Sequence, residues 1–162
     1  MSTSRPSDKI KRKMPGNDLF FQKVLPQWRE NREKIVFTNG CFDLLHAGHI
    51  NNLSRASELG DKLIVGLNSD QSVRELKGPS RPVQKEKDRQ LILASLFFVD
   101  LVLIFEDETP TRLIENITPH VLVKGGDYPI NEVEGGDHVI RNGGNVVLLP
   151  LIPGRSTSSL IS

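Results

Sequence analysis

Five short apolar runs, separated by segments with helical patterns, constrain the fold of this 162-residue chain more than any other feature. Each run is apolar throughout rather than at alternate positions, which is typical of strands covered by helices on both faces. Because crossovers between parallel strands are right-handed, the pattern predicts an α/β fold with a doubly wound, mostly parallel five-stranded sheet. The runs are 35–37, 63–67, 101–105, 121–123 and 146–149.

Three of the intervening segments show clear helix signals. Apolar residues recur every three positions over 50–59, and Gly60 is placed to cap the C-terminus of that helix. A second helix is expected over 88–99. A third is expected after Thr109, with this threonine as N-cap and Pro110 at the first helical position.

The segment before the first strand divides into two parts. Residues 1–15 are polar and basic without apolar periodicity, so we expect a flexible tail there and a single domain over 16–162. Residues 17–33 have the pattern of a short amphipathic helix that is interrupted near Pro26.

Overall composition excludes several classes of partner. The chain has 21 Lys and Arg against 20 Asp and Glu, and this net charge of +1 gives no bulk reason to bind nucleic acid or a membrane surface. Its single cysteine, Cys41, excludes an internal disulfide. No apolar stretch approaches the roughly 18 residues of a membrane span or resembles a signal peptide, so we expect a cytoplasmic protein.

The loops that follow the expected strands should carry the chemistry, because ligands of such sheets bind at the carboxyl ends of the strands. Neither a G-x-G-x-x-G after the first strand nor a G-x-x-x-x-G-K-[ST] motif is present, which argues against a dinucleotide dehydrogenase and a P-loop enzyme. Three of the loops nevertheless combine glycine with histidine, lysine or hydroxyl groups. These residue types bind phosphate oxygens.

The loop "TNGCFDLLHAGH" over 38–49 admits three interpretations. Cys41, Asp43, His46 and His49 are possible zinc ligands, but a structural zinc site usually has four ligands and no second cluster completes one. Cys41 as a nucleophile needs a base, and a cysteine between Gly and Phe is more often buried. The third interpretation is a phosphate site.

The phosphate interpretation uses all the parts of this loop. If a helix begins near residue 45 or 46, His46 and His49 share its first turn, where unpaired backbone N–H groups attract anions. Gly48 lies between them, and its missing side chain lets a ligand approach the backbone.

The stretch "GCFDLLHAGH" resembles the H-x-G-H signature of the nucleotidyltransferase superfamily, which includes the glycerol-phosphate and choline-phosphate cytidylyltransferases. Residues 36–83, "VDLVLIFEDETP" and "VLVKGGDYP" more narrowly resemble the D-glycero-β-D-manno-heptose 1-phosphate adenylyltransferases, and the similarity runs from about Lys34 to the end. The resemblance implies a Rossmann-like nucleotidyltransferase fold. It also implies transfer of AMP from ATP to the sugar 1-phosphate with Mg²⁺, which releases pyrophosphate and gives ADP-heptose for lipopolysaccharide. Relatives often lie behind a sugar kinase, whereas this chain is expected to be the stand-alone form and a homo-oligomer, namely a dimer.

The same resemblance assigns roles to individual residues. His46 and His49 would contact the triphosphate and stabilise charge as pyrophosphate leaves, while Lys77 in "ELKG" would supply a mobile positive charge. Further nucleotide contacts would come from the backbone of Gly40, Cys41 and Phe42 at the α-phosphate, from Gly48, from Asp127, and from Ser156, Thr157 and Ser158 at the outer phosphates. Asp43, Arg81 and Lys124 are weaker candidates for binding the sugar phosphate.

Some features keep other readings open. Where CTP-using relatives have an arginine directly after a Leu-Pro pair, this chain has Leu151, and its arginine comes later, at Arg155. This favours ATP, with a cytidylyltransferase acting on glycerol 3-phosphate as the alternative and an idle nucleotide-binding module as a third possibility. Asn68 and Asp70 could reach ribose or metal, or simply form a turn and a helix cap.

Overall fold

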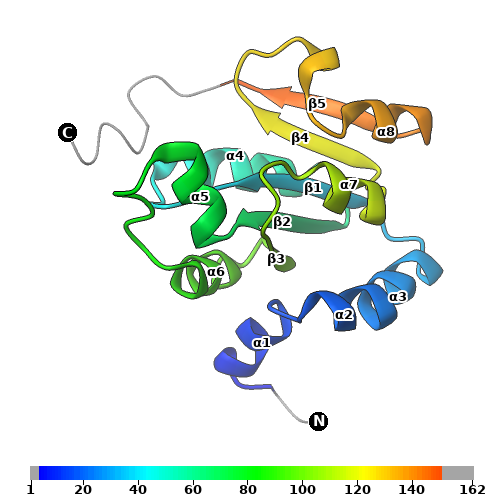
Figure 1. The fold of residues 1–162 in the computed structure, drawn as a ribbon. Helices are drawn as coiled ribbons and strands as arrows, with labels where there is room; N and C mark the ends of the chain where they lie inside the picture. Colours follow the sequence, from blue (N-terminus) through cyan, green and yellow to red (C-terminus); the bar gives the residue numbers. More distant parts are fainter. Residues whose placement is uncertain (1–3, 151–162) are drawn as a thin grey trace.

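The computed structural model describes residues 4–150, which contain one sheet of five parallel strands in the order β3-β2-β1-β4-β5 (Figure 1). This confirms the predicted α/β fold and all five strands. The strands are β1 Ile35–Gly40, β2 Lys62–Asn68, β3 Leu101–Phe105, β4 Val121–Gly125 and β5 Asn145–Leu149. No helix in the described part of the chain is long and apolar enough to cross a membrane.

Helices connect the strands and precede the first one. The N-terminal helices are α1 Pro6–Arg12, α2 Asn17–Leu19, the π-helix η1 Phe20–Val24 and α3 Leu25–Glu30. The connecting helices are α4 Ala47–Ser57, α5 Asp70–Lys77, α6 Glu86–Ala94, α7 Thr111–Ile117, the 3₁₀ helix η2 Ile130–Glu132 and α8 Gly136–Arg141.

The direction of winding reverses between β1 and β4. The chain proceeds from β1 outward through β2 to β3, then returns to the other side of β1 with β4 and β5 (Figure 1). The crevice at the carboxyl ends of the two strands beside such a reversal is the usual ligand site of a doubly wound sheet.

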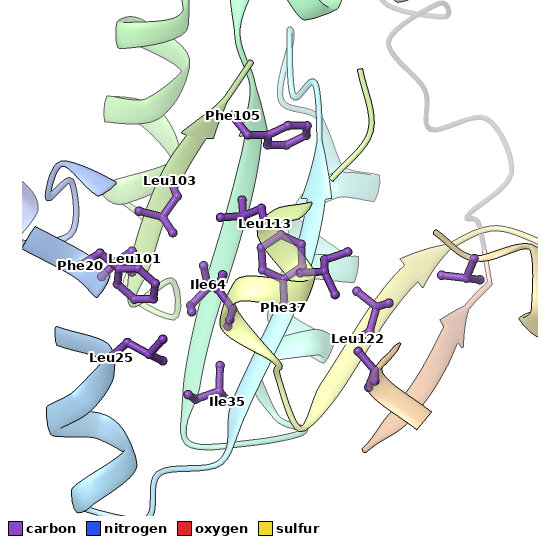
Figure 2. Packing of buried hydrophobic residues seen from close by; sticks show 14 residues of the cluster. Phe20, Leu25, Ile35, Phe37, Ile64, Leu101, Leu103, Phe105, Leu113 and Leu122 are labelled. Atoms are coloured by element: carbon purple, nitrogen blue, oxygen red, sulfur yellow. The ribbon is translucent and has the colours of Figure 1, made fainter. Parts of the chain in front are cut away.

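Each face of the sheet has its own hydrophobic core. On one face, side chains of α3, η1, α7 and α8 cover Ile35, Phe37 and Ile64, as Figure 2 shows for most of that cluster. On the other face, α4 and α6 cover Val36 and Val65. Successive residues of β1 therefore point into opposite cores, which explains why its sequence is apolar at every position.

The expectation of a flexible tail over 1–15 is wrong for the described part of that segment. Residues 6–12 form α1, and Ile10 and Met14 pack against the core face that also holds α4 and α6. The backbone of Lys13 accepts a hydrogen bond from the N–H of Val102 on β3 (2.8 Å). Because β3 is an edge strand with backbone groups that would otherwise lack a partner in the sheet, this contact orders the segment.

The helix expected over 17–33 does not break at Pro26. Instead, the chain widens into the π-helical turn η1 directly before α3, in which Pro26 is the second residue. The turn leaves Phe20 and Leu25 buried in the core, as Figure 2 shows. The helical backbone continues through Val24 and Leu25, so the wider π turn is where the chain accommodates the N–H that Pro26 lacks.

Other helix limits differ from the expected ones. The C-terminus of α4 is capped at Glu58 rather than at Gly60. Gly60 serves close packing instead, because a Cβ there would lie 2.7 Å from the carbonyl oxygen of Lys34. The second helix ends at Ala94 rather than 99, and α7 has Pro110 rather than Thr109 as its N-cap.

Candidate active site

The two histidines of the H-x-G-H motif cap α4 reciprocally. His46 is the N-cap residue, and its Nδ1 accepts hydrogen bonds from the N–H groups of Gly48 (3.1 Å) and His49 (3.4 Å). The N–H of His46 in turn donates to Nδ1 of His49 (3.3 Å). This is the geometry of a capping box, with imidazoles in place of the usual hydroxyl and carboxylate. It accounts for the spacing of three residues between the histidines.

The cap determines which ring nitrogen carries the proton. Since Nδ1 of both His46 and His49 accepts hydrogen bonds, each neutral ring is protonated at Nε2. The rings stack with centroids 3.7 Å apart and an angle of 23° between their planes. Two Nε2–H donors on adjacent stacked rings suit an anion with several oxygens, such as a polyphosphate.

The pKa of His49 is lowered to about 4, chiefly because the ring is buried, with smaller contributions from repulsion by the protonated form of His46 and by Lys77. The ring is therefore neutral near pH 7 before an anion binds. A phosphate beside it would favour the imidazolium form and raise this pKa.

The backbone between β1 and α4 is shaped by Phe42. This residue has a positive φ of 46°, and its ring folds back so that a Cβ on Gly40 would lie 2.9 Å from it. The Phe42 ring also packs edge-to-face against the His49 ring, with the ring centroids 5.3 Å apart. Gly40 thus permits the turn that brings the 40–42 backbone beside the histidines.

The thiol of Cys41 does not match the nucleophile interpretation. Burial raises its pKa above the ordinary value, against the opposing influence of Lys77, Arg89 and Arg81. A nucleophilic cysteine normally shows the opposite shift.

A cavity of about 390 Å³, which we call the first cavity, lies at the carboxyl ends of β1 and β4. Among its lining residues are seven of the candidates: Gly40, Cys41, Phe42, Asp43, His49, Lys77 and Lys124. The ring of His46 stacks on that of His49, which lines the cavity. Lys77 is the exposed last residue of α5, a position from which a long cationic side chain can reach a ligand.

Two further candidates, Gly48 and Asp127, do not line this cavity. Gly48 is buried in the first turn of α4. Asp127 is exposed in the loop after β4 and does not line the cavity. Arg155, Ser156, Thr157 and Ser158 lie outside the described residues.

Asp43 anchors a loop, and its carboxylate accepts hydrogen bonds from three protein donors. It accepts from Arg81 Nε (2.6 Å) and from the N–H groups of Val83 and Gln84 (2.9 Å each). Burial alone would raise the pKa of Asp43, but these hydrogen bonds outweigh it and lower the pKa. These contacts give Asp43 a structural role, and its contact with substrate stays a prediction. Arg81 keeps one buried nitrogen, Nη2, without a hydrogen-bond partner in the described structure.

Arg89 is a residue whose role the sequence did not reveal. Its side chain is fully buried, and its guanidinium donates to the carbonyl oxygens of Cys41 and Asn68 (2.8 Å each) and of Gln84 (2.9 Å). A fourth bond reaches Asp70 Oδ1 (2.8 Å). One side chain thus joins the loop after β1, the end of β2 and the loop before α6. The only signal was an arginine within the apolar run "RQLILA".

Asn68 and Asp70 fit the turn-and-cap alternative. Asn68 donates to the hydroxyl of Ser72 (2.8 Å), Asp70 pairs with Arg89, and Ser69 caps α5. The zinc interpretation finds no support either. The Asp43 carboxylate and both Nδ1 atoms of the histidines already have partners, and no group of three or more possible ligands comes together in residues 4–150.

Comparison with known proteins agrees with this geometry. The chain matches the cytidylyltransferase-like family over residues 37–152. It is 49% identical over 160 residues to the bifunctional protein HldE of Magnetococcus marinus and 54% identical over 141 residues to that of Caulobacter vibrioides. These alignments cover 99% and 87% of this chain but only 32% and 29% of the relatives. The chain therefore spans about a third of the length of these relatives.

Two solved structures share the fold. The lipopolysaccharide core biosynthesis protein of Thermoplasma volcanium aligns with a TM-score of 0.61 and 25% identity, over 74% of this chain and 97% of that one. Pantoate-beta-alanine ligase of Francisella tularensis, solved with beta-gamma ATP and beta-alanine, aligns with a TM-score of 0.58 and 17% identity, over 85% of this chain and 66% of that one. The H-x-G-H resemblance is confirmed by the family match: this chain belongs to the cytidylyltransferase-like family.

Proposed function

We propose that this protein transfers AMP from ATP to D-glycero-β-D-manno-heptose 1-phosphate, giving ADP-heptose and pyrophosphate for lipopolysaccharide core synthesis. The observation that carries the nucleotidyltransferase part is the reciprocal histidine cap, which presents two Nε2–H donors beside a cavity that also holds Lys77. The choice of ATP and the heptose is supported by the resemblance of the loops and by about 50% identity to HldE proteins.

The proposed reaction is a direct transfer. An oxygen of the sugar phosphate attacks the α-phosphorus of ATP and forms a new P–O bond, while the bond from the α-phosphorus to the bridging oxygen breaks and pyrophosphate leaves. Negative charge grows on the bridging oxygen, so preorganised donors aimed at it accelerate the step. His46 and His49 supply these donors through Nε2, and Lys77 neutralises the departing phosphates.

The backbone between Gly40 and Phe42 lies beside the α-phosphate in this proposal, and Arg89 holds that backbone through the carbonyl of Cys41. Lys124 lines the same cavity at the end of β4 and binds the incoming phosphate. Asp127 would contact the nucleotide only from the rim, since it is exposed in the next loop. Ser156, Thr157 and Ser158 are proposed to hold the outer phosphates.

Mg²⁺ is the proposed cofactor. The only carboxylate that lines the first cavity among residues 4–150 is Asp43, whose oxygens are occupied by Arg81 and two backbone N–H groups. The residues present thus fit an ion held mainly by the nucleotide's own phosphates, as is usual for Mg²⁺. When bound, the ion would neutralise phosphate charge.

The test is a pyrophosphate-release assay across four nucleoside triphosphates and a panel of sugar 1-phosphates and glycerol 3-phosphate, with products identified by mass. We expect the highest kcat/KM with ATP and D-glycero-β-D-manno-heptose 1-phosphate, and dependence on added Mg²⁺. A higher kcat/KM with CTP and glycerol 3-phosphate would replace the adenylyltransferase assignment with the alternative.

A further inference from the structure

A second cavity of about 200 Å³ adjoins the first and shares Asn39, Lys124 and Tyr128 with it. The two cavities lie on opposite faces of the sheet. Thr38 and Val123 line only the first, whereas Leu122, the strand neighbour of Val123, lines only the second. Alternate residues of a strand point to opposite faces, so the tips of β1 and β4 separate the cavities.

The chemistry of the second cavity differs from that of the first. Its floor is apolar, with Pro110, Leu122 and Val133, and its polar lining includes the carboxylates of Glu132 and Glu134. Two carboxylates would repel a polyphosphate. They are instead good acceptors for hydroxyl groups, and carboxylates form strong hydrogen bonds.

The two glutamates are held in place by the residues around them. Val133, which lies between them, is 8% exposed and packs into the core cluster of Figure 2. Gly135 follows with a φ of 80°, and a Cβ there would lie 2.8 Å from the side chain of Ile114 on α7. The exposed glutamates therefore stand on a segment fixed against α7.

The direction of the reaction links the two cavities. In a phosphoryl-type transfer the attacking and leaving oxygens lie roughly in line on opposite sides of the phosphorus. His49 and Lys77 place the leaving pyrophosphate in the first cavity, so the acceptor must approach from the other side. Lys124 stands at the junction, with Nζ 5.8 Å from the centre of the Tyr128 ring, where an acceptor phosphate would meet the α-phosphate.

We propose that the second cavity is the acceptor subsite, which takes the polyhydroxylated ring of a sugar phosphate, with Glu132 and Glu134 accepting hydrogen bonds from its hydroxyl groups and Lys124 holding its phosphate. The proposal rests on the proposed transferase function. The volume of the second cavity is below the 300 to 1,000 Å³ typical of sites for larger ligands. A cavity of this size suits a single sugar ring better than a nucleotide.

The test uses Glu132→Ala, Glu134→Ala and the double variant, with Glu108→Ala as a matched control, because Glu108 is exposed and lines neither cavity. KM and kcat are measured for the best sugar 1-phosphate at saturating ATP. Binding of a non-hydrolysable ATP analogue is measured separately without sugar. We expect the acceptor KM to rise about tenfold for each single variant, the scale of one lost hydrogen bond to a charged group, and the Kd of the analogue to stay within about twofold.

A second measurement compares acceptors that lack single hydroxyl groups. If a glutamate binds a given hydroxyl group, removal of that hydroxyl from the acceptor should lower kcat/KM with the unaltered protein. With the alanine variant of that glutamate, removal of the same hydroxyl should lower kcat/KM little further. Unchanged acceptor KM in the double variant, with an active unaltered protein, would overturn the subsite and leave the proposed function standing. If the unaltered protein turns over no sugar phosphate with any triphosphate, both proposals fail.

Discussion

The imidazole rings of His46 and His49 stack 3.7 Å apart, and each Nδ1 accepts the backbone N–H of the other residue. The same two side chains therefore begin α4 and present Nε2 for chemistry. These two tasks are separable by mutation, because other residues can cap a helix but cannot supply an imidazole.

For His46→Ser we expect a stable protein with poor turnover. Serine is a strong N-cap residue, so the free energy of unfolding should change by less than about 0.5 kcal/mol, whereas kcat should fall by roughly 10² or more with the loss of a donor to the leaving group. His46→Ala should lose the same activity and about 1 kcal/mol of stability in addition. Urea denaturation and pyrophosphate release measure the two effects, and an unchanged kcat in His46→Ser would refute the catalytic role.

The lowered pKa of His49 predicts how stability depends on pH. The pKa is about 4 in the folded protein against the ordinary value of 6.5, so between these values the unfolded chain binds more protons than the folded one. The contribution of His49 to stability is thus complete above about pH 6.5 and is lost as the pH falls toward 4. Thermal melts at pH 7.5 and 5 should show a smaller loss for His49→Gln than for the unaltered protein. An equal loss would contradict the shift.

Nucleotide binding should reverse this shift. A triphosphate beside His49 favours the imidazolium, so we expect net proton uptake when ATP binds near pH 5.5. Calorimetry in two buffers of different ionisation enthalpy measures the uptake, which should shrink in His49→Gln. Binding without proton exchange would place the triphosphate away from this ring.

Cys41→Ser should retain kcat within a few-fold. Burial raises the pKa of the thiol, and a direct transfer needs only the backbone of this residue. Alkylation by iodoacetamide should accordingly be slow below pH 8 and slower still with ATP bound. A loss of kcat by 10² or more in Cys41→Ser, with normal stability, would revive the nucleophile interpretation.

The sequence was informative where a local pattern has one structural outcome. Continuous apolar runs predicted every strand, because a strand buried on both faces has no place for polar side chains. It was misleading where the partner is distant in the chain. Nothing near Lys13 indicates that its carbonyl pairs with Val102, 89 residues later, and so α1 was mistaken for part of a flexible tail.

The same limit applies to the site. The H-x-G-H spacing predicted the two histidines on one helical turn, and three positions is also the spacing of partners in a capping box. Asp43 belongs to the same motif and is predicted to bind substrate, but the motif does not indicate its partners within the chain, which are Arg81, Val83 and Gln84. Only the folded loop shows that the carboxylate is already occupied.

Arg89 provides the last prediction, because it holds the backbone at Cys41 without lining the first cavity. Arg89→Lys keeps the positive charge but can reach only some of the four acceptors, so we expect about 3 kcal/mol lower stability from lost charge-assisted hydrogen bonds. Release of the Cys41 carbonyl should also shift the 40–42 backbone, and a displacement of about 1 Å at a reacting group costs on the order of 10² in rate.

The control is Asp70→Asn, which alters one of the four contacts of Arg89 and leaves its three bonds to carbonyl oxygens in place. Activity is expressed per folded molecule, at a temperature well below the melting point of each variant. A purely structural role would lower the folded fraction and leave kcat and the KM for ATP per folded molecule unchanged. A positioning role lowers kcat per folded Arg89→Lys molecule by about 10² while Asp70→Asn stays within a few-fold.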